Sequence, residues 1–157
     1  MELTKQKKTA KRGVKTNELT IKLPAISENE AVARAIVGAF AARLDPTLEE
    51  LADIRCAVSE AVTNCVVHAY KEREGSLYIT MRSYDDKTLK ITVKDTGKGI
   101  ENVKRAMEPM FTTESGTERS GMGFAVMQSF TDDVRVRSAL GKGTTVTLTK
   151  RMGCTEE

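Results

Sequence analysis

Apolar and polar residues alternate in several short segments of the chain, which is the pattern of strands with one buried and one exposed face. The segments are 19–23, 77–81, 89–93, 134–136 and 146–148. Pro24 ends the first of them, and turn residues at 85–87 and 141–143 join the other four into two hairpins. The pattern therefore predicts five strands.

Helical spacing of apolar residues predicts the segments between the strands. Ser27 and Glu30 form a candidate capping box that opens a first helix. The face of this helix that we expect to be buried consists of Val32, Ala35, Ile36, Ala39 and Phe40. The run 45–47 stops this helix, and Thr47 with Glu50 opens a longer one that reaches about Glu72.

Two shorter helices are expected at 101–108 and 124–130. The stretch 112–123 between them is rich in Thr, Ser and Gly and is too long for a tight turn, so we interpret it as a mobile functional loop. The order strand, helix, helix, two strands, helices, two strands predicts an α/β fold, an α+β sandwich in which one mixed sheet carries helices on one face.

Composition narrows the possible classes of protein. The 157 residues include no apolar run near the roughly 20 that a membrane helix needs, and the charged N-terminus lacks the apolar stretch of a signal peptide. We therefore expect a cytosolic protein. Three cysteines without a CxxC pair favour reduced, structural thiols over a disulfide framework or a zinc site.

The net charge of +3 is unevenly distributed. Residues 1–17 carry six basic side chains against one acidic side chain, so the remainder is close to neutral. There is no Trp, and the few other aromatic residues are scattered, which argues against a platform for nucleic acid. We expect 1–17 to be a disordered basic tail, 18–152 to be one domain and 153–157 to be a C-terminal tail.

Polar side chains interrupt the apolar second helix at four-residue spacing. Glu60, Asn64 and His68 would form one ridge along it. The ridge could simply be the solvent face of an amphipathic helix. Alternatively, Glu60 could orient a proton, and Asn64, one turn away, could offer an oxygen ligand to Mg²⁺. His68 is more simply a residue of the helix end.

Three glycine-containing segments could approach a ligand closely, although each is also explained as an ordinary turn. Asp95-Thr96-Gly97-Lys98-Gly99 follows a strand, so an acid stands where the sheet ends. Ser120-Gly121-Met122-Gly123-Phe124 leads into a helix, where exposed N–H groups suit phosphate. Gly141-Lys142-Gly143-Thr144-Thr145 forms the last hairpin turn.

The conjunction of these motifs is more specific than any one of them. The stretches SEAVTNCVVHAY, DTGKGI, PMFTT, ERSGMGF and GKGTT occur in that order. The series resembles the GHKL, or Bergerat, ATP-binding fold shared by gyrase, histidine kinases and MutL. Within that group it is most similar to the anti-sigma factor kinases of sporulation, over about residues 18–152.

This resemblance implies a site for ATP and Mg²⁺. Asp95 would accept a hydrogen bond from the adenine amino group, with Thr144 beside the same ring edge and Gly97 and Gly99 allowing the approach. Asn64 would ligate Mg²⁺. The phosphate end would be held by N–H groups and side chains of the lid and the helix start, namely Thr113, Ser120, Gly121, Met122, Gly123 and Phe124.

The resemblance also implies catalytic and partner roles. Glu60 would deprotonate the acceptor hydroxyl, and Arg119 would neutralise charge on the γ-phosphate. Such a protein phosphorylates a serine of an anti-anti-sigma protein and sequesters a sigma factor of the sigma F type. Arg34 is the candidate partner contact. A homodimer paired through the edge strand 19–23 is expected, with no direct contact to nucleic acid or membrane.

Two alternatives remain open. The chain could serve a stress-response sigma factor instead of a sporulation one. It could also be a non-catalytic switch that holds a sigma factor under the control of ATP.

Overall fold

A computed structural model describes residues 13–71, 74–108 and 123–153. The helices and strands in these ranges, in chain order, are β1 (Lys15–Pro24), α1 (Glu28–Ala41), η1 (Ala42–Leu44), α2 (Leu48–Asn64), η2 (Cys65–Ala69), β2 (Ser76–Tyr84), β3 (Thr88–Asp95), α3 (Val103–Ala106), α4 (Gly123–Phe130), β4 (Asp133–Ala139) and β5 (Gly143–Arg151). The five predicted strands and the two hairpins are confirmed. Strand β1 begins at Lys15, four residues before Leu19.

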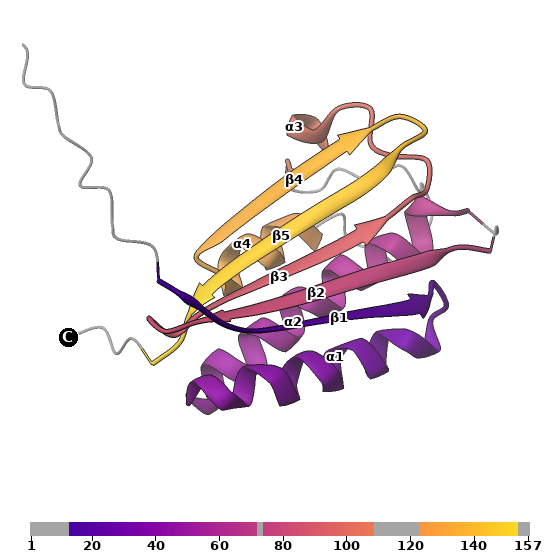
Figure 1. The fold of residues 1–157 in the computed structure, drawn as a ribbon. Helices are drawn as coiled ribbons and strands as arrows, with labels where there is room; N and C mark the ends of the chain where they lie inside the picture. The colour runs from indigo at the N-terminus through magenta and orange to yellow at the C-terminus, as the bar shows by residue number, and fades with distance from the viewer. Residues whose placement is uncertain (1–12, 72–73, 109–122, 154–157) are drawn as a thin grey trace, which may run out of the picture.

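The strands form one sheet in the order β1-β2-β3-β5-β4 (Figure 1). Every described strand pair is antiparallel, so the expectation of a mixed sheet is wrong in this respect. The chain crosses from β3 through α4 to β4, and these two strands run in the same direction. They do not pair, because β5 turns back from β4 and inserts between them.

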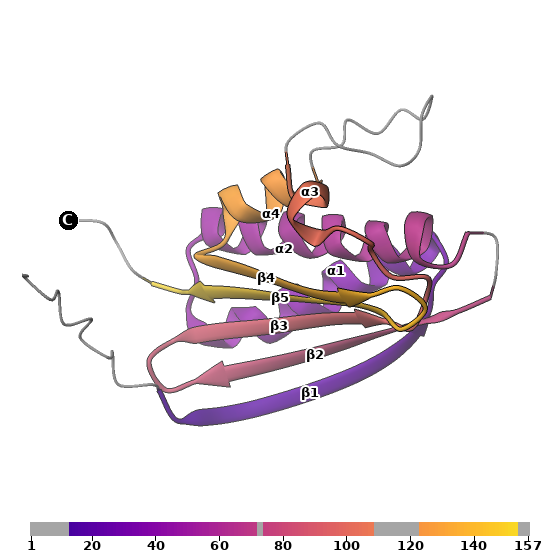
Figure 2. The ribbon, with the colours of Figure 1, turned by 90° about the horizontal axis from the view of Figure 1, so that it is seen from above.

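The helices α1, α2 and α4 cover one face of the sheet, which confirms the predicted α/β layering (Figure 2). Alternate residues of the central strands point into this layer. Leu77, Ile79 and Met81 of β2 are fully buried. The core also takes Ile91 and Leu148 from β3 and β5. The periodicity of two along the sequence therefore reflects one covered face and one open face of the sheet.

Helix α1 packs through a different face from the one expected. The residues that it buries are Ala33, Val37, Gly38, Phe40 and Ala41. Of the predicted face, only Phe40 is buried, whereas Val32 remains 42% exposed. The predicted face was wrong because α1 carries apolar residues on both sides. Periodicity alone therefore could not select the side that packs against the sheet.

The two capping boxes have different outcomes. Thr47 and Glu50 form the predicted box at the start of α2, with both reciprocal hydrogen bonds present. Ser27 makes no side-chain cap hydrogen bond at the start of α1. Its predicted partner Glu30 instead accepts a hydrogen bond from the hydroxyl of Ser59 on α2. A tertiary contact has replaced the local one.

The helix expected at 101–108 is reduced to the single turn α3. Asn102 caps this turn by accepting from the N–H of Arg105 at 3.0 Å. Helix α4 closely matches the expected 124–130. In the part of the chain that the structure describes, no helix is both long enough and apolar enough to cross a membrane.

Candidate functional site

Helix α2 carries Glu60 and Asn64 where it meets the start of α4. Its buried face, which includes Ile54, Val58 and Val62, lies against the core. Glu60 and Asn64 are half-buried on another side of the helix. A Cβ placed on Gly123 would lie 3.2 Å from Glu60 Oε2 and 3.6 Å from Asn64 Oδ1. The structure therefore brings these three predicted residues together, and the absence of a side chain at Gly123 avoids a tight contact with Glu60.

His68 lies beyond the end of α2. Residues Cys65–Ala69 form a π turn, η2, directly after α2. Hydrogen bonds in a π turn span five residues, so His68 lies outside the regular α-helical geometry that relates Glu60 to Asn64. The preference for His68 as a helix-end residue agrees with its place in this turn.

Asp95 ends β3 and is buried, with 4% of its surface exposed. Its Oδ1 accepts hydrogen bonds from the backbone N–H of Gly97 at 3.0 Å and of Thr144 at 3.2 Å. Its Oδ2 accepts from the thiol of Cys65 at 3.5 Å. Two backbone donors therefore fix one carboxylate oxygen, and the other retains accepting capacity for a ligand.

The loop after Asp95 packs closely against η2 and the end of β4. The N–H of Lys98 donates to the carbonyl of Ala69 in η2 at 2.8 Å. A Cβ on Gly97 would come within 2.2 Å of that same carbonyl oxygen. Gly99 has φ of +76°, and a Cβ there would lie 2.1 Å from the carbonyl oxygen of Ala139. Only glycine allows this close packing, which holds Asp95 at the end of the sheet.

Ser138 positions Thr144, and sequence reasoning missed it. Its hydroxyl donates to the carbonyl of Gly143 at 3.0 Å and accepts from the N–H of Ile100 at 2.7 Å. Thr144 Oγ1 lies 2.8 Å from Ser138 Oγ. Because the single proton of Ser138 is already used, Thr144 donates in this contact and keeps its lone pairs for a ligand. The only signal in the sequence was a serine where Val134 and Val136 predict another apolar residue.

Cys65 is the second residue that sequence reasoning missed. It directly follows Asn64 and touches Asp95, so it links the two groups of predicted residues. Burial, followed by the charge and hydrogen bond of Asp95, raises the pKa of the Cys65 thiol well above its usual range. The thiol is therefore protonated near neutral pH and acts as a donor. The interpretation of a structural thiol did not anticipate this contact.

Arg34 lies apart from these residues, on α1. Its Nη1 is 3.7 Å from Glu30 Oε1, and its side chain is 41% exposed. Glu30 in turn accepts from Ser59, the neighbour of Glu60. Arg34, the predicted partner contact, is thus a half-exposed cation close to the Glu30–Ser59 contact between α1 and α2.

The remaining predicted residues divide into two groups. Phe124 lies in α4 and packs, half-buried, against the core. Thr113, Arg119, Ser120, Gly121 and Met122 lie outside the described residues.

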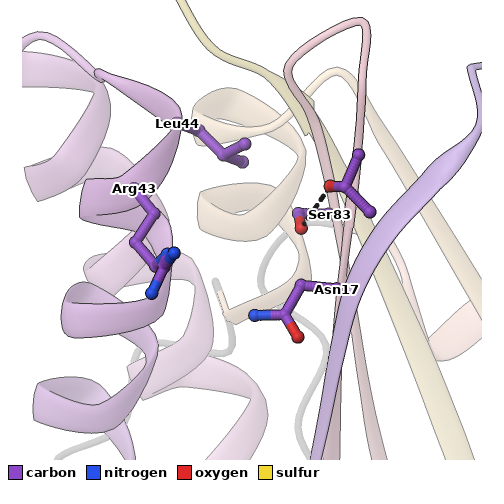
Figure 3. A pocket seen from close by; sticks show the side chains of 5 residues that line it. Asn17, Arg43, Leu44 and Ser83 are labelled. Atoms are coloured by element: carbon purple, nitrogen blue, oxygen red, sulfur yellow. Dashed lines mark hydrogen bonds between the residues drawn. The ribbon is translucent and has the colours of Figure 1, made fainter.

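A separate pocket lies at the opposite end of the sheet, where β1 begins. Figure 3 shows it between η1 and strands β1 and β2. Its lining residues are Thr16, Asn17, Arg43, Leu44 and Ser83. Thr16 Oγ1 and Ser83 Oγ are hydrogen-bonded to each other at 3.0 Å. None of the predicted site residues lines this pocket.

Comparisons with known proteins agree on one family. The profile of the histidine kinase-like ATPase domain matches residues 23–150. The chain is 54% identical over 138 residues to an anti-sigma F factor of Caldanaerobacter subterraneus, covering 87% of this chain and 95% of the relative. It is 45% identical over 137 residues to an anti-sigma F factor of Bacillus subtilis, covering 87% of this chain and 93% of the relative.

A solved structure shares the fold. The RsbU and RsbW domains of Rv1364c from Mycobacterium tuberculosis match with a TM-score of 0.64 at 24% identity. The match covers 87% of this chain and 33% of that longer chain.

Proposed function

The chain belongs to the anti-sigma F factors, a family built on the histidine kinase-like ATPase domain, and from this premise we propose that it is a Mg-ATP-dependent protein serine kinase. It binds and inhibits a sigma factor of the sigma F type. It also phosphorylates a serine of an anti-anti-sigma protein. The observation that supports the proposal most directly is the hydrogen bonding of Asp95. Backbone N–H groups hold its Oδ1, and its Oδ2 retains accepting capacity.

Asp95 and Thr144 form the adenine end of the proposed site. The carboxylate Oδ2 accepts from the adenine amino group, and the Thr144 hydroxyl accepts at the same ring edge. Hydrogen bonds within the protein hold both residues in place. Backbone N–H groups donate to Asp95, and Thr144 is bonded to Ser138. Preorganised groups of this kind bind a ligand at little cost in ordering.

The phosphates lie between Asn64 and the start of α4. Gly123 supports this placement, because its backbone lies so close to α2 that a Cβ there would be only 3.6 Å from Asn64 Oδ1. Asn64 Oδ1 offers an oxygen ligand, the donor type that Mg²⁺ prefers, so the residues present fit the ion. Bound Mg²⁺ would neutralise charge on the phosphates. Gly121, Met122, Phe124, Thr113 and Ser120 complete the phosphate end in this proposal.

Glu60 acts on the acceptor serine. Its carboxylate stands next to Gly123, at the phosphate end of the site. It takes the proton of the serine hydroxyl as the serine oxygen bonds to the γ-phosphorus. The bond from that phosphorus to the bridging oxygen breaks, and ADP leaves. Arg119 neutralises the charge that develops on the transferred group.

Arg34 contacts the sigma factor and the anti-anti-sigma protein in turn. Its guanidinium is half-exposed and is steadied by Glu30. Because Glu30 also bonds Ser59, the partner surface is connected to the helix that bears Glu60.

The protein forms a homodimer through β1 and α1. Strand β1 is an edge of the described sheet, and its Leu19 remains 41% exposed. Val32 on α1 is 42% exposed. An unpaired edge strand and exposed apolar side chains are features that a second copy can cover.

The nucleotide site is tested by Asp95→Asn. An amide in place of the carboxylate presents a donor toward the adenine amino group, so ATP affinity should fall at least about tenfold. Isothermal titration calorimetry with Mg-ATP measures this fall, and circular dichroism verifies the fold. Unchanged affinity in a folded variant would reject the adenine role of Asp95.

Phosphate transfer is tested by Glu60→Gln. This variant keeps the size and hydrogen-bonding reach of the side chain but cannot accept the serine proton. With γ-labelled ATP and the anti-anti-sigma protein, labelling should drop at least about a hundredfold while ATP binding persists. If the wild-type protein itself transfers no label, the non-catalytic ATP-gated switch replaces the kinase.

The regulon is tested by the choice of partner. Capture of a sporulation sigma factor by the ATP-bound protein supports the proposal. Exclusive capture of a stress-response sigma factor favours the alternative function.

A further inference from the structure

We infer that Cys65 positions the Asp95 carboxylate and thereby helps the site select an adenine nucleotide over a 6-oxopurine nucleotide. The inference rests on the proposed function, because it assigns a role inside the same nucleotide site.

The geometry around Asp95 singles out Cys65. Among the described residues, Oδ1 has two backbone donors, at 3.0 and 3.2 Å, and Oδ2 has the Cys65 thiol at 3.5 Å. Both side chains are 4% exposed. Rotation of the carboxylate would therefore break contacts at both oxygens, and the thiol contacts the oxygen that the proposed function assigns to the ligand.

A thiol suits this position because it is a weak donor. It stays protonated beside the carboxylate, so it can donate to Oδ2 but cannot repel it. Its weak hydrogen bond leaves most of the accepting capacity of Oδ2 for the ligand.

Base selection follows from this arrangement. Adenine carries an amino donor at position 6, whereas hypoxanthine and guanine carry an oxygen acceptor there. A carboxylate oxygen Oδ2 that is held in place attracts the first and repels the second. If the thiol is removed, a water molecule can enter and donate to both Oδ2 and a 6-oxo group, which relieves the repulsion.

The test compares ATP with inosine triphosphate, which differs from ATP at position 6 of the base. Calorimetry with Mg²⁺ yields both dissociation constants for each variant. We expect Cys65→Ala to reduce the preference for ATP by about three- to tenfold, the range for one hydrogen bond. Cys65→Ser has nearly the same volume as the alanine variant but keeps a donor, so it should restore most of the preference.

A second pair of variants guards against a folding defect. Cys65→Val and Cys65→Thr have the same shape as each other, and only the threonine variant can donate to Asp95. We expect the preference for ATP over inosine triphosphate to be reduced in the valine variant and largely retained in the threonine variant. Cys56→Ala, which alters an exposed thiol of the preceding helix α2, should leave the preference unchanged.

The outcomes separate this inference from the proposed function. If ATP binds to the wild-type protein and the preference is equal in the alanine and serine variants, Cys65 only fills space and the inference fails. Equal losses of affinity for both nucleotides would overturn it in the same way. If the wild-type protein binds neither triphosphate, the proposed nucleotide function fails as well.

Discussion

At the scale of single residues, the two described cysteines differ in surroundings although one helical segment carries both. Cys56 is exposed on α2, and Cys65 is buried in η2. Burial, with the negative charges of Glu60 and Asp53, raises the pKa of the Cys56 thiol. The pKa of Cys65 is raised further, by deeper burial and by Asp95.

Alkylation should distinguish the two thiols. The thiolate is the reactive form, so iodoacetamide should label Cys56 slowly at pH 7 and faster as the pH rises. Cys65 should stay unlabelled in the folded protein and react only after denaturation. Peptide mass spectrometry on a Cys154→Ser background measures both sites. Native labelling of Cys65 at the rate of Cys56 would contradict its burial against Asp95.

At the scale of elements, the start of α2 is the best-defined helix end. Thr47 Oγ1 accepts from the N–H of Glu50 at 3.1 Å, and Glu50 Oε2 accepts from the N–H of Thr47 at 2.8 Å. Glu50 also accepts from the N–H of Gly153 at 3.0 Å, which ties the helix to the segment after β5. The cap therefore has a tertiary role in addition to its local one.

Removing this cap should destabilise the protein. Thr47→Ala should cost about 1 kcal/mol of unfolding free energy. That loss lowers the melting temperature by about 3 °C in a chain of this size. Ser27→Ala is the matched control, because Ser27 occupies an N-cap position without a cap hydrogen bond. Equal losses in the two variants, measured by thermal unfolding, would contradict the capping assignment.

The same cap predicts a dependence on pH. Burial acts to raise the pKa of Glu50, but the backbone hydrogen bonds from Gly153 and Thr47 outweigh it, so the pKa is lowered from 4.5. The stabilisation by Glu50 is therefore complete above about pH 4.5 and is lost as the pH falls through the lower folded value. In urea titrations, the difference in unfolding free energy between wild type and Glu50→Gln should shrink between about pH 5 and pH 3, because the Glu50 carboxylate becomes protonated over this range. A gap that stays constant over this range would contradict the assignment.

At the scale of the whole molecule, one layer of helices leaves apolar surface at the β1 edge. The side of α1 away from the core includes Val32, and Leu19 of β1 is not fully covered. The exposed apolar side of α1 accounts for the wrong choice of its buried face, and the exposed Val32 and Leu19 support the proposed dimer.

A charge on this surface should separate the dimer. Val32→Glu should shift sedimentation equilibrium toward the monomer by at least about tenfold in dissociation constant, because a carboxylate would be buried without a partner. Leu48→Glu is the control, since Leu48 is 88% exposed at the start of α2. ATP affinity should be unchanged in both variants. Equal dimerisation of the two variants would place the dimer contact elsewhere.

The sequence by itself determined most of the described elements and selected the candidate residues of the proposed site. Alternation located all five strands, and Thr47 with Glu50 marked the start of α2, because these patterns depend on neighbours a few residues apart. Asp95, Asn64 and Glu60 could be selected because a polar side chain in an apolar segment stands out locally.

Tertiary structure alone decided which surfaces and side chains meet. It inserted β5 between β3 and β4, chose the buried side of α1 and moved Glu30 from a local cap to Ser59. It also placed Cys65 on Asp95 and Ser138 on Thr144. These contacts join residues distant in sequence, and their free energy depends on packing between elements, which no local pattern of residues encodes.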